Sequence, residues 1–335
     1  MTATGAGSTA RAEPPAELVA RFKGALERLW PEGGKLGLAV SGGPDSLAMM
    51  LLAEAAIPER FEVATVDHGL RPDSANECAM VAEVCAARSL PCQIIRIEVA
   101  KGNLHAQARR ARYEALAKWA KRREISDIAT GHHADDQAET LLMRLNRGSG
   151  LAGLAGVREV GFVRYTRVGL IRPLLTFRRA ELAEVVAHSG LEPVRDPSNE
   201  DERFDRTRIR RSLATADWLD PVALARSASL LGEAQRAVEA VAEEQWLDRA
   251  FPEEDGVRYY PASPDFFVEV ETVMVIFARR GWTATRSEIA RLVERLFLGE
   301  PSNLGGVLVR PTKELREGVE IARWTFRPEP PRRTG

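Results

Sequence analysis

Short apolar runs alternate with longer amphipathic stretches through the first half of the chain. The short runs predict buried strands at about 36–40, 61–66, 92–98 and 126–130. The stretches around them predict helices at about 16–29, 45–55, 73–89, 103–123 and 134–146. Because strands that alternate with helices build a parallel sheet, the pattern predicts a Rossmann-like α/β fold with helices on both faces.

The pattern changes beyond residue 147. Residues 147–176 are glycine-rich and predict irregular structure, followed by a helix at Arg178–Ser189. The later elements are a long helix at 222–248, a linker at 252–265, a helix at 285–298, and a hairpin pairing 307–309 with 321–326. We therefore predict a flexible tail (1–15), an α/β domain (16–215) and a mainly helical domain with a small mixed C-terminal segment (216–335).

Composition adds few constraints to this picture. The 335 residues are 44% hydrophobic and 28% charged, with no apolar run long enough to span a bilayer. The N-terminal stretch has no apolar core, and three cysteines do not make a disulfide framework, so we expect a cytoplasmic protein without membrane contact. Cys78 and Cys85 are spaced to share one buried helix face, and the absence of a CxxC pair gives a zinc or iron–sulfur site little support.

The net charge of −1 hides segregated blocks of charge. Residues 101–123 carry eight Lys or Arg against one acid, and residues 203–211 carry five arginines against Asp205. Residues 233–255 reverse the sign, with eight acids against two arginines. This segregation is typical of a protein that binds a polyanion on one side, although each block alone also fits a solvated helix face.

The loop Ser41-Gly42-Gly43-Pro44-Asp45-Ser46 separates the first predicted strand from its helix. Glycines let backbone N–H groups approach an anion, and the helix start adds the positive end of its dipole. The two serines supply hydroxyl donors, and Asp45 can hold a magnesium ion that bridges phosphate oxygens. The loop therefore predicts nucleotide phosphate binding; the alternative is a plain strand-to-helix turn with Ser41 or Asp45 as its N-cap.

Two further motifs follow strand ends and should meet this loop at one edge of the sheet. Asp67 and His68 follow the second strand, where they either border a nucleotide or form an Asx-type turn. Residues 130–140 carry His132 and His133 followed by three acids, Asp135, Asp136 and Glu139. These favour amine binding or proton transfer; the HxxxH spacing of helical zinc ligands is absent, and acids also suit a helix start.

Arginines supply the remaining candidates. Arg109 and Arg112 lie three apart on one helix face, where two guanidiniums can clamp phosphates, unless the helix is merely solvated. Arg203, Arg206, Arg208 and Arg210 recur at short intervals after an Asp-Pro-Ser-Asn turn, which suits RNA phosphates or, alternatively, the start of a surface helix.

Together these motifs resemble the tRNA(Ile)-lysidine synthetases, a family of N-type PP-loop ATP pyrophosphatases. The matching segments are SGGPDS at 41–46, VDHGLR at 66–71, GNLHAQARRARYEAL at 102–116, TGHHADDQAETLLMRLNRGSG at 130–150, IRPLL at 171–175 and DPSNEDERFDRTRIR at 196–210. The resemblance covers residues 30–215 and is weak beyond them. It indicates a short form, because most long members carry a C-terminal tRNA-binding module.

The resemblance implies an ATP- and Mg²⁺-dependent ligase that acts on tRNA(Ile) with anticodon CAU and on free L-lysine. ATP adenylates C2 of cytidine 34 with release of pyrophosphate, and the lysine ε-amine then displaces AMP to form lysidine. The implied ATP-binding residues are Ser41, Gly42, Gly43, Pro44, Asp45, Ser46, Asp67 and His68, with Asp45 also the magnesium ligand. The implied catalytic residues are Asp45, Arg109, Arg112, His133 and Asp136.

The remaining implied roles are lysine binding by Asp135, Asp136 and Glu139, and tRNA binding by Arg203, Arg206, Arg208 and Arg210. The oligomeric state stays open, with a homodimer as one option. Three alternatives remain: tRNA 2-thiolation by a related PP-loop enzyme, a non-catalytic nucleotide- or RNA-binding protein, and an amide-forming ligase. Thiolation is disfavoured by the missing CxxC pair.

Overall fold

The computed structural model describes residues 13–70, 73–98, 104–194, 205–262 and 265–329, without side chains for residues 104–106. The chain divides into an N-terminal unit, Met1–Gly232, and a C-terminal unit, Glu233–Gly335. The division lies inside one long helix, α9 (Pro221–Arg249), whereas the sequence predicted a boundary at 215/216. Every described residue of the predicted site belongs to the N-terminal unit.

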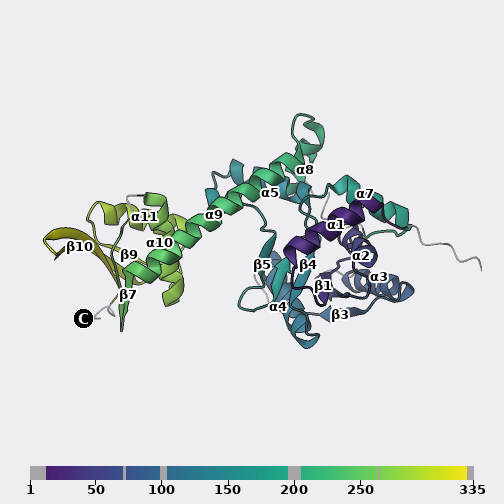
Figure 1. The fold of residues 1–335 in the computed structure, drawn as a ribbon, viewed down its shortest axis with the longest axis horizontal. Coiled ribbons are helices and arrows are strands. Elements are labelled where there is room, and N and C mark those ends of the chain that lie inside the picture. The colour runs from purple at the N-terminus through teal and green to yellow at the C-terminus, as the bar shows by residue number, and fades with distance from the viewer. Residues whose placement is uncertain (1–12, 71–72, 99–103, 195–204, 263–264, 330–335) are drawn as a thin grey trace, which may run out of the picture. The chain divides into compact units, whose positions relative to one another are not determined.

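The N-terminal unit is built on a six-stranded sheet in the order β3-β2-β1-β4-β6-β5 (Figure 1). Its strands are β1 (Leu36–Ala39), β2 (Phe61–Asp67), β3 (Cys92–Arg96), β4 (Asp127–Thr130), β5 (Val160–Phe162) and β6 (Gly169–Ile171). All neighbouring strands are parallel except β5, which is antiparallel to β6. This confirms the predicted Rossmann-like sheet, with β5 and β6 in the segment predicted to be irregular.

Helices cover both faces of this sheet. Besides α9, the helices of the unit are α1 (Ala16–Leu29), α2 (Pro44–Ala56), α3 (Ser74–Ala87), α4 (Leu104–Arg122), α5 (Ala134–Asn146), α6 (Leu151–Leu154), α7 (Arg179–Ser189) and α8 (Asp205–Thr215), of which α6 and α8 pack on α5. The core on one face joins α1, α2, α3 and α7 to β1 through Leu36, Leu38 and Val40. On the other face Trp119 of α4 packs in a separate core with Ala39 and Ile128. The alternation of side chains along β1 thus serves two cores at once.

The cysteines follow the predicted pattern. Cys78 and Cys85 are buried on α3, and Cys92 begins β3. All three are free thiols.

The C-terminal unit contains more strand than the sequence predicted. Beside α9, α10 (Phe266–Arg280) and α11 (Arg286–Phe297) it has a five-stranded sheet in the order β7-β8-β11-β10-β9. Its strands are β7 (Ala250–Glu253), β8 (Gly256–Tyr259), β9 (Ser302–Leu304), β10 (Val307–Arg316) and β11 (Val319–Pro328). The predicted hairpin is confirmed, because Val309 pairs with Phe326.

Two predictions for this region were wrong. The predicted linker at 252–265 holds most of a hairpin, β7–β8, whose strands pair Glu253 with Gly256 around a short turn. Glu254 and Asp255 form this turn, and Gly256 follows it as the first residue of β8. The helix α10 lies in a stretch predicted only as a mixed tail; its acid Glu269 is buried and accepts a hydrogen bond from Tyr259 Oη at 2.6 Å.

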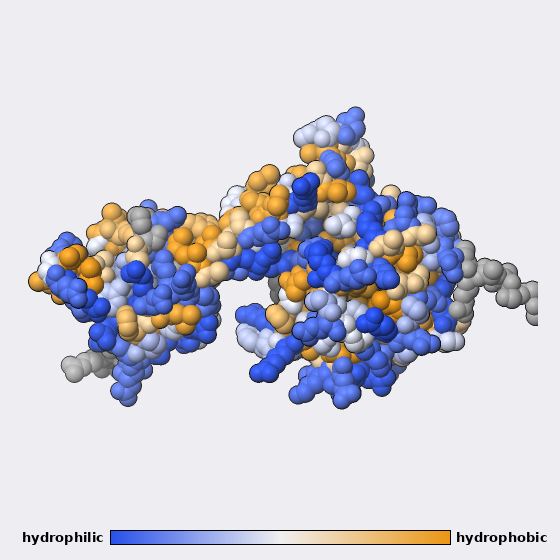
Figure 2. Space-filling model, viewed as in Figure 1, coloured by the Kyte–Doolittle hydropathy of each residue, from blue (hydrophilic) through white to orange (hydrophobic). Residues whose placement is uncertain are grey.

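On the face drawn in Figure 2, apolar patches are interrupted by hydrophilic surface. None of the helices in the described part of the chain is both long and apolar enough to cross a bilayer. Residues 1–12 of the predicted tail lie outside the described residues.

The close approach of α4 to β1 generates a stability prediction. A Cβ atom added at Gly37 would lie 2.7 Å from Trp119 Cζ3 and 3.3 Å from Ile125 Cγ2. We expect Gly37→Ala to lower the free energy of unfolding by about 1–3 kcal/mol through overpacking. Gly24→Ala is the matched control, because nothing lies within 4 Å of its added Cβ on α1. That change should raise stability by about 0.5–1 kcal/mol. Urea denaturation measures the free energy of unfolding of both variants. Equal changes in the two variants would contradict the packing argument.

Candidate active site

The loop between β1 and α2 lies where the strand order turns back, at the carboxyl ends of the parallel strands. Gly42 has φ +85°, a backbone conformation that glycine adopts without strain. Ser46 Oγ accepts a hydrogen bond from Ser41 N at 3.1 Å and donates one to Gly43 O at 3.0 Å. Pro44 occupies the first turn of α2, where its missing N–H costs nothing. The loop is therefore fixed by its own side chains at the start of a helix.

The end of β4 packs directly against this loop. A Cβ atom at Gly131 would lie 3.2 Å from the Asp45 carbonyl and from Ser46 N, so glycine permits the contact. On the other side, Val194 N donates to Gly42 O at 2.9 Å. Segments distant in sequence thus converge on residues 41–46, as the sequence predicted for one edge of the sheet.

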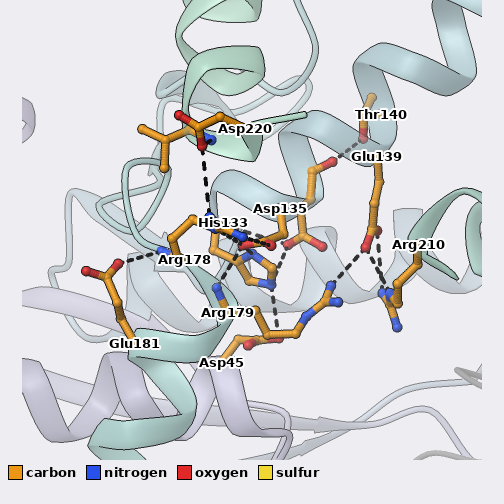
Figure 3. A network of polar contacts seen from close by, with 12 residues as sticks. Asp45, His133, Asp135, Glu139, Thr140, Arg178, Arg179, Glu181, Arg210 and Asp220 are labelled. Atoms are coloured by element: carbon orange, nitrogen blue, oxygen red, sulfur yellow. Dashed lines mark hydrogen bonds and ion pairs between the residues drawn. The ribbon is translucent and has the colours of Figure 1, made fainter. Parts of the chain in front are cut away.

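His133 lies at the centre of an acidic cluster (Figure 3). Its side chain is fully buried, with Nε2 3.5 Å from Asp45 Oδ2 and 3.6 Å from Asp136 Oδ2, and Nδ1 3.6 Å from Asp135 Oδ2. Burial lowers the pKa of His133, but Asp135, Asp45 and Asp136 outweigh it and raise the pKa to about 9. His133 is therefore a buried cation at neutral pH, and it ties the start of α2 to the start of α5.

Asp135 points away from the loop toward α7. Its Oδ2 accepts from Arg179 N at 2.8 Å, and the Arg178 side chain lies 3.4 Å away (Figure 3). Burial raises the pKa of Asp135, but His133 and these α7 donors hold it well below its usual range. Asp135 is thus a fixed anion that anchors α7.

Glu139 has surroundings that the sequence did not predict. It is 1% exposed and contacts Arg179 at 2.9 Å, Arg206 at 2.7 Å and Arg210 at 2.8 Å. Burial raises its pKa, but Arg210 and Arg206 lower it to about 2. The structure does not place Glu139 in a cavity; its carboxylate joins α5 to α7 and α8.

The arginines predicted to bind tRNA separate into two groups. Arg206 also donates to Asp136 Oδ1 at 2.6 Å, so Arg206 and Arg210 are paired with the carboxylates of α5. Arg208 is 66% exposed and pairs with Asp205 of its own helix. Arg203 lies outside the described residues, as do the Asp-Pro-Ser-Asn turn and Phe204. The basic block from 205 onward forms α8, the helix that the sequence offered as its alternative.

Two adjoining cavities open at the loop. The larger, about 320 Å³, lies over the ends of β1 and β2 and is lined by His68, Ser74 and Cys78 among others. The smaller, about 200 Å³, is lined by Arg109, His132, Asp136 and Arg206 among others. Their shared wall consists of Ala39, Ser41, Gly43, Asp45 and Arg112. Asp45 Oδ1 is buried there without a hydrogen-bond partner in the described residues, which leaves it an open acceptor for a cation.

Asp67 contributes to the larger cavity indirectly. Its Oδ1 accepts hydrogen bonds from Gly69 N at 3.0 Å and from Ser74 Oγ, and the Ser74 bond is the main reason that its pKa is lowered. This is the Asx-type turn that the sequence left open as the alternative. His68 lines the larger cavity, and its contact with a nucleotide stays a prediction.

His132 of the smaller cavity and Arg172 close to it belong to a cluster of cationic side chains that the sequence did not predict. His132 lies close to four arginines, and burial, then Arg172 and Arg109, lower its pKa to about 3. Arg172 is buried, and its own pKa is lowered by burial. Burial also lowers the pKa of Arg112, and repulsion from Arg109 lowers it further. Arg172 belongs to the IRPLL segment and His132 to GHHADD, so both motifs had been found without a role for these residues.

The buried His133 cation predicts a pH dependence of stability. Its pKa is raised from 6.5 to about 9, so its stabilisation is complete below about pH 6.5 and is lost as the pH rises through 9. Between about pH 6.5 and 9 we expect the free energy of unfolding to fall further in the wild type than in His133→Gln. The difference in this fall should be up to about 3 kcal/mol. Urea denaturation in magnesium-free buffer measures the difference, and parallel curves for the two proteins would refute the assignment.

Comparisons with known proteins agree with this geometry. The PP-loop domain family matches residues 16–216. The tRNA(Ile)-lysidine synthase of Novosphingobium aromaticivorans is 45% identical over 290 residues, which cover 86% of this chain and 89% of that protein. The tRNA(Ile)-lysidine synthase of Zymomonas mobilis is 38% identical, covering 90% of this chain and 91% of that protein.

A solved structure supports the fold alone. The U34-tRNA thiolase NcsA of Methanococcus maripaludis superimposes with a TM-score of 0.53 at 16% identity, covering 65% of this chain and 80% of that one. Together, the loop, the cavities beside it and the identity over most of the chain lead to one conclusion. The chain belongs to the tRNA(Ile)-lysidine synthase family of PP-loop, ATP-using enzymes.

Proposed function

We propose that the two cavities carry out lysidine formation on tRNA(Ile) with anticodon CAU. In the first step the C2 carbonyl oxygen of cytidine 34 attacks the α-phosphorus of ATP, and pyrophosphate leaves. In the second step the ε-amine of free lysine attacks C2, AMP leaves with the former carbonyl oxygen, and the amine loses a proton. The observation that carries this proposal is Asp45, whose carboxylate lies in the wall common to both cavities.

ATP is proposed to occupy the larger cavity, with its phosphates at residues 41–46. The first turn of α2 offers backbone N–H groups and the positive end of a helix dipole to those phosphates. Arg112 lines both cavities and Arg109 the smaller one, so their guanidiniums can stabilise charge that develops during adenylation. Asp45 Oδ1 fits a Mg²⁺ ligand, because it is an open carboxylate oxygen beside the phosphate loop. The ion would supply charge neutralisation there.

Lysine is proposed to enter the smaller cavity, with its α-ammonium at Asp136. This is the carboxylate of α5 that lines the cavity, whereas Asp135 faces α7 and Glu139 is enclosed by three arginines. Arg206 already contacts Asp136 at 2.6 Å. An arriving ammonium therefore shares the Asp136 carboxylate with Arg206 or replaces Arg206 there, so it does not add an uncompensated charge. This assignment narrows the predicted lysine ligands from three acids to one.

His133 is assigned a positioning role. The sequence predicted a proton relay, but a histidine that keeps its proton up to about pH 9 is a poor general base at neutral pH. The imidazolium instead fixes the orientation of Asp45 and Asp136, the carboxylates proposed for magnesium and lysine. For tRNA, Arg208 is more exposed than Arg206 and Arg210 and remains the proposed phosphate contact on α8.

The direct test is ATP- and Mg²⁺-dependent incorporation of labelled lysine into tRNA. We expect incorporation into tRNA(Ile) with anticodon CAU and none into tRNA(Met) with the same anticodon. A non-catalytic nucleotide- or RNA-binding protein would bind ATP or tRNA without releasing pyrophosphate. That result with correctly folded protein would overturn the proposal.

A pair of carboxylate-to-amide variants separates the two steps. We expect Asp45→Asn to lower tRNA-dependent pyrophosphate release by roughly a hundredfold or more, because the phosphate-side carboxylate loses its charge. Asp136→Asn should retain pyrophosphate release and raise the KM for lysine roughly 10- to 100-fold, the effect of losing one charged hydrogen bond. Exposed Glu27 on α1 supplies the control Glu27→Gln, which should change neither value. If Asp136→Asn lowered pyrophosphate release as strongly as Asp45→Asn, and the residual activity kept the wild-type KM for lysine, Asp136 would be reassigned to adenylation.

A further inference from the structure

The turn between β5 and β6 presents an exposed aromatic side chain outside the active site. Tyr165 is 81% exposed, and Phe162 at the end of β5 is 71% exposed. The turn itself is well ordered by hydrogen bonds, with Thr166 N donating to Val163 O at 3.0 Å and Val163 N to Val168 O at 2.9 Å. A defined turn therefore holds a large ring in solvent.

The backbone conformation of Tyr165 is a second indication that the exposed ring has a function. Tyr165 has φ +62°, a left-handed conformation that glycine or asparagine adopts at lower cost than a bulky residue. The ring has no packing role that offsets this cost, since most of its surface meets water. Strain at an exposed side chain is the kind of feature that a binding function explains.

Unpaired cations surround the ring. A cavity of about 610 Å³ lies between this turn and α4, with Ala117, Ile125 and Val168 among its lining residues. Its cations are Lys118, Lys121, Arg164 and Arg167. Within the described part of the chain none of these four has an ion-pair partner, while the acid of the cavity, Glu114, is paired with Arg110 at 2.7 Å. The guanidinium of Arg164 lies 4.8 Å from the centre of the Tyr165 ring.

This surface lies at the opposite edge of the sheet from the active site. Because β6 is parallel to β4 and Gly169 pairs with Asp127, the turn before Gly169 lies at the amino ends of these strands. The active-site residues follow Thr130, at the other end of β4. The four residues of β4 alone span about 13 Å at the rise of a strand. A nucleotide inserted at the active site does not reach both places.

We propose that residues 163–168 and the adjacent face of α4 form a second RNA-binding surface, where a base of the tRNA outside the anticodon loop stacks on Tyr165. The cations then contact the flanking phosphates. The chemistry fits nucleic acid, because an exposed aromatic ring among unpaired cations is what stacking and backbone contacts require. This inference rests on the proposed function for the identity of the RNA, and it adds a contact that the reaction itself does not need.

The test compares tRNA(Ile) with its isolated anticodon stem–loop, using fluorescence anisotropy at fixed salt. Tyr165→Asn removes the ring while suiting the left-handed backbone, so a folding defect is not expected. We expect it to weaken binding of the full tRNA roughly 5- to 100-fold and to leave stem–loop and ATP binding unchanged. Tyr165→Phe keeps the ring and should bind like the wild type.

The salt dependence supplies an independent measurement. Neutralising Lys118 and Lys121 together by glutamine should reduce the magnitude of the slope of log K against log salt for the full tRNA by roughly 1.5–2, and leave the stem–loop slope unchanged. Wild-type affinity of Tyr165→Asn for the full tRNA would overturn the inference, as would equal losses for both RNAs. Capture of an acidic protein by this surface with no change in tRNA affinity would also overturn it. If any of these outcomes occurred while lysine incorporation stayed intact, the proposed function would still stand. A wild type that binds neither RNA would remove both the inference and the proposed function.

Discussion

A buried positive charge organises the N-terminal unit. His133 is fully buried among Asp45, Asp135 and Asp136, which come from two helices that are far apart in sequence. A buried ion is costly unless counter-charges surround it, so the imidazolium and the carboxylates each require the other. Asp135 extends the constraint to α7 through the backbone N–H of Arg179. The start of α2, which follows the glycine loop after β1, is thereby held against the start of α5.

Adjacent histidines divide the edge of the sheet into two electrostatic regions. The pKa of His133 is raised to about 9 among carboxylates, whereas that of His132 is lowered to about 3 by burial and by neighbouring arginines. His133 has extended backbone, in which consecutive side chains point in opposite directions. The side chains of His132 and His133 therefore lie in environments of opposite charge.

The sequence predicted what depends on local pattern. The four parallel strands from β1 to β4, the phosphate loop and the converging motifs follow from apolar periodicity and strand ends, and the structure confirms that arrangement. The sequence could not predict how each acid of α5 is paired, because partners such as Arg206 and Glu139 are 67 residues apart. Nor did periodicity distinguish α8 from a loop, since none of the α8 residues is buried and the helix has no apolar stripe.

The network around Glu139 shows that the carboxylates of α5 have different surroundings. Glu139 and Asp135 share a helix face by their spacing, and the sequence assigned both to the same ligand. In the structure Arg179 contacts Glu139 through its guanidinium and Asp135 through its backbone N–H, so both acids are used to hold α7. Asp136 lies one residue along and lines the smaller cavity, with Arg206 as its counter-ion. Cations of the protein itself thus neutralise Asp135 and Glu139, while Asp136 lines the smaller cavity.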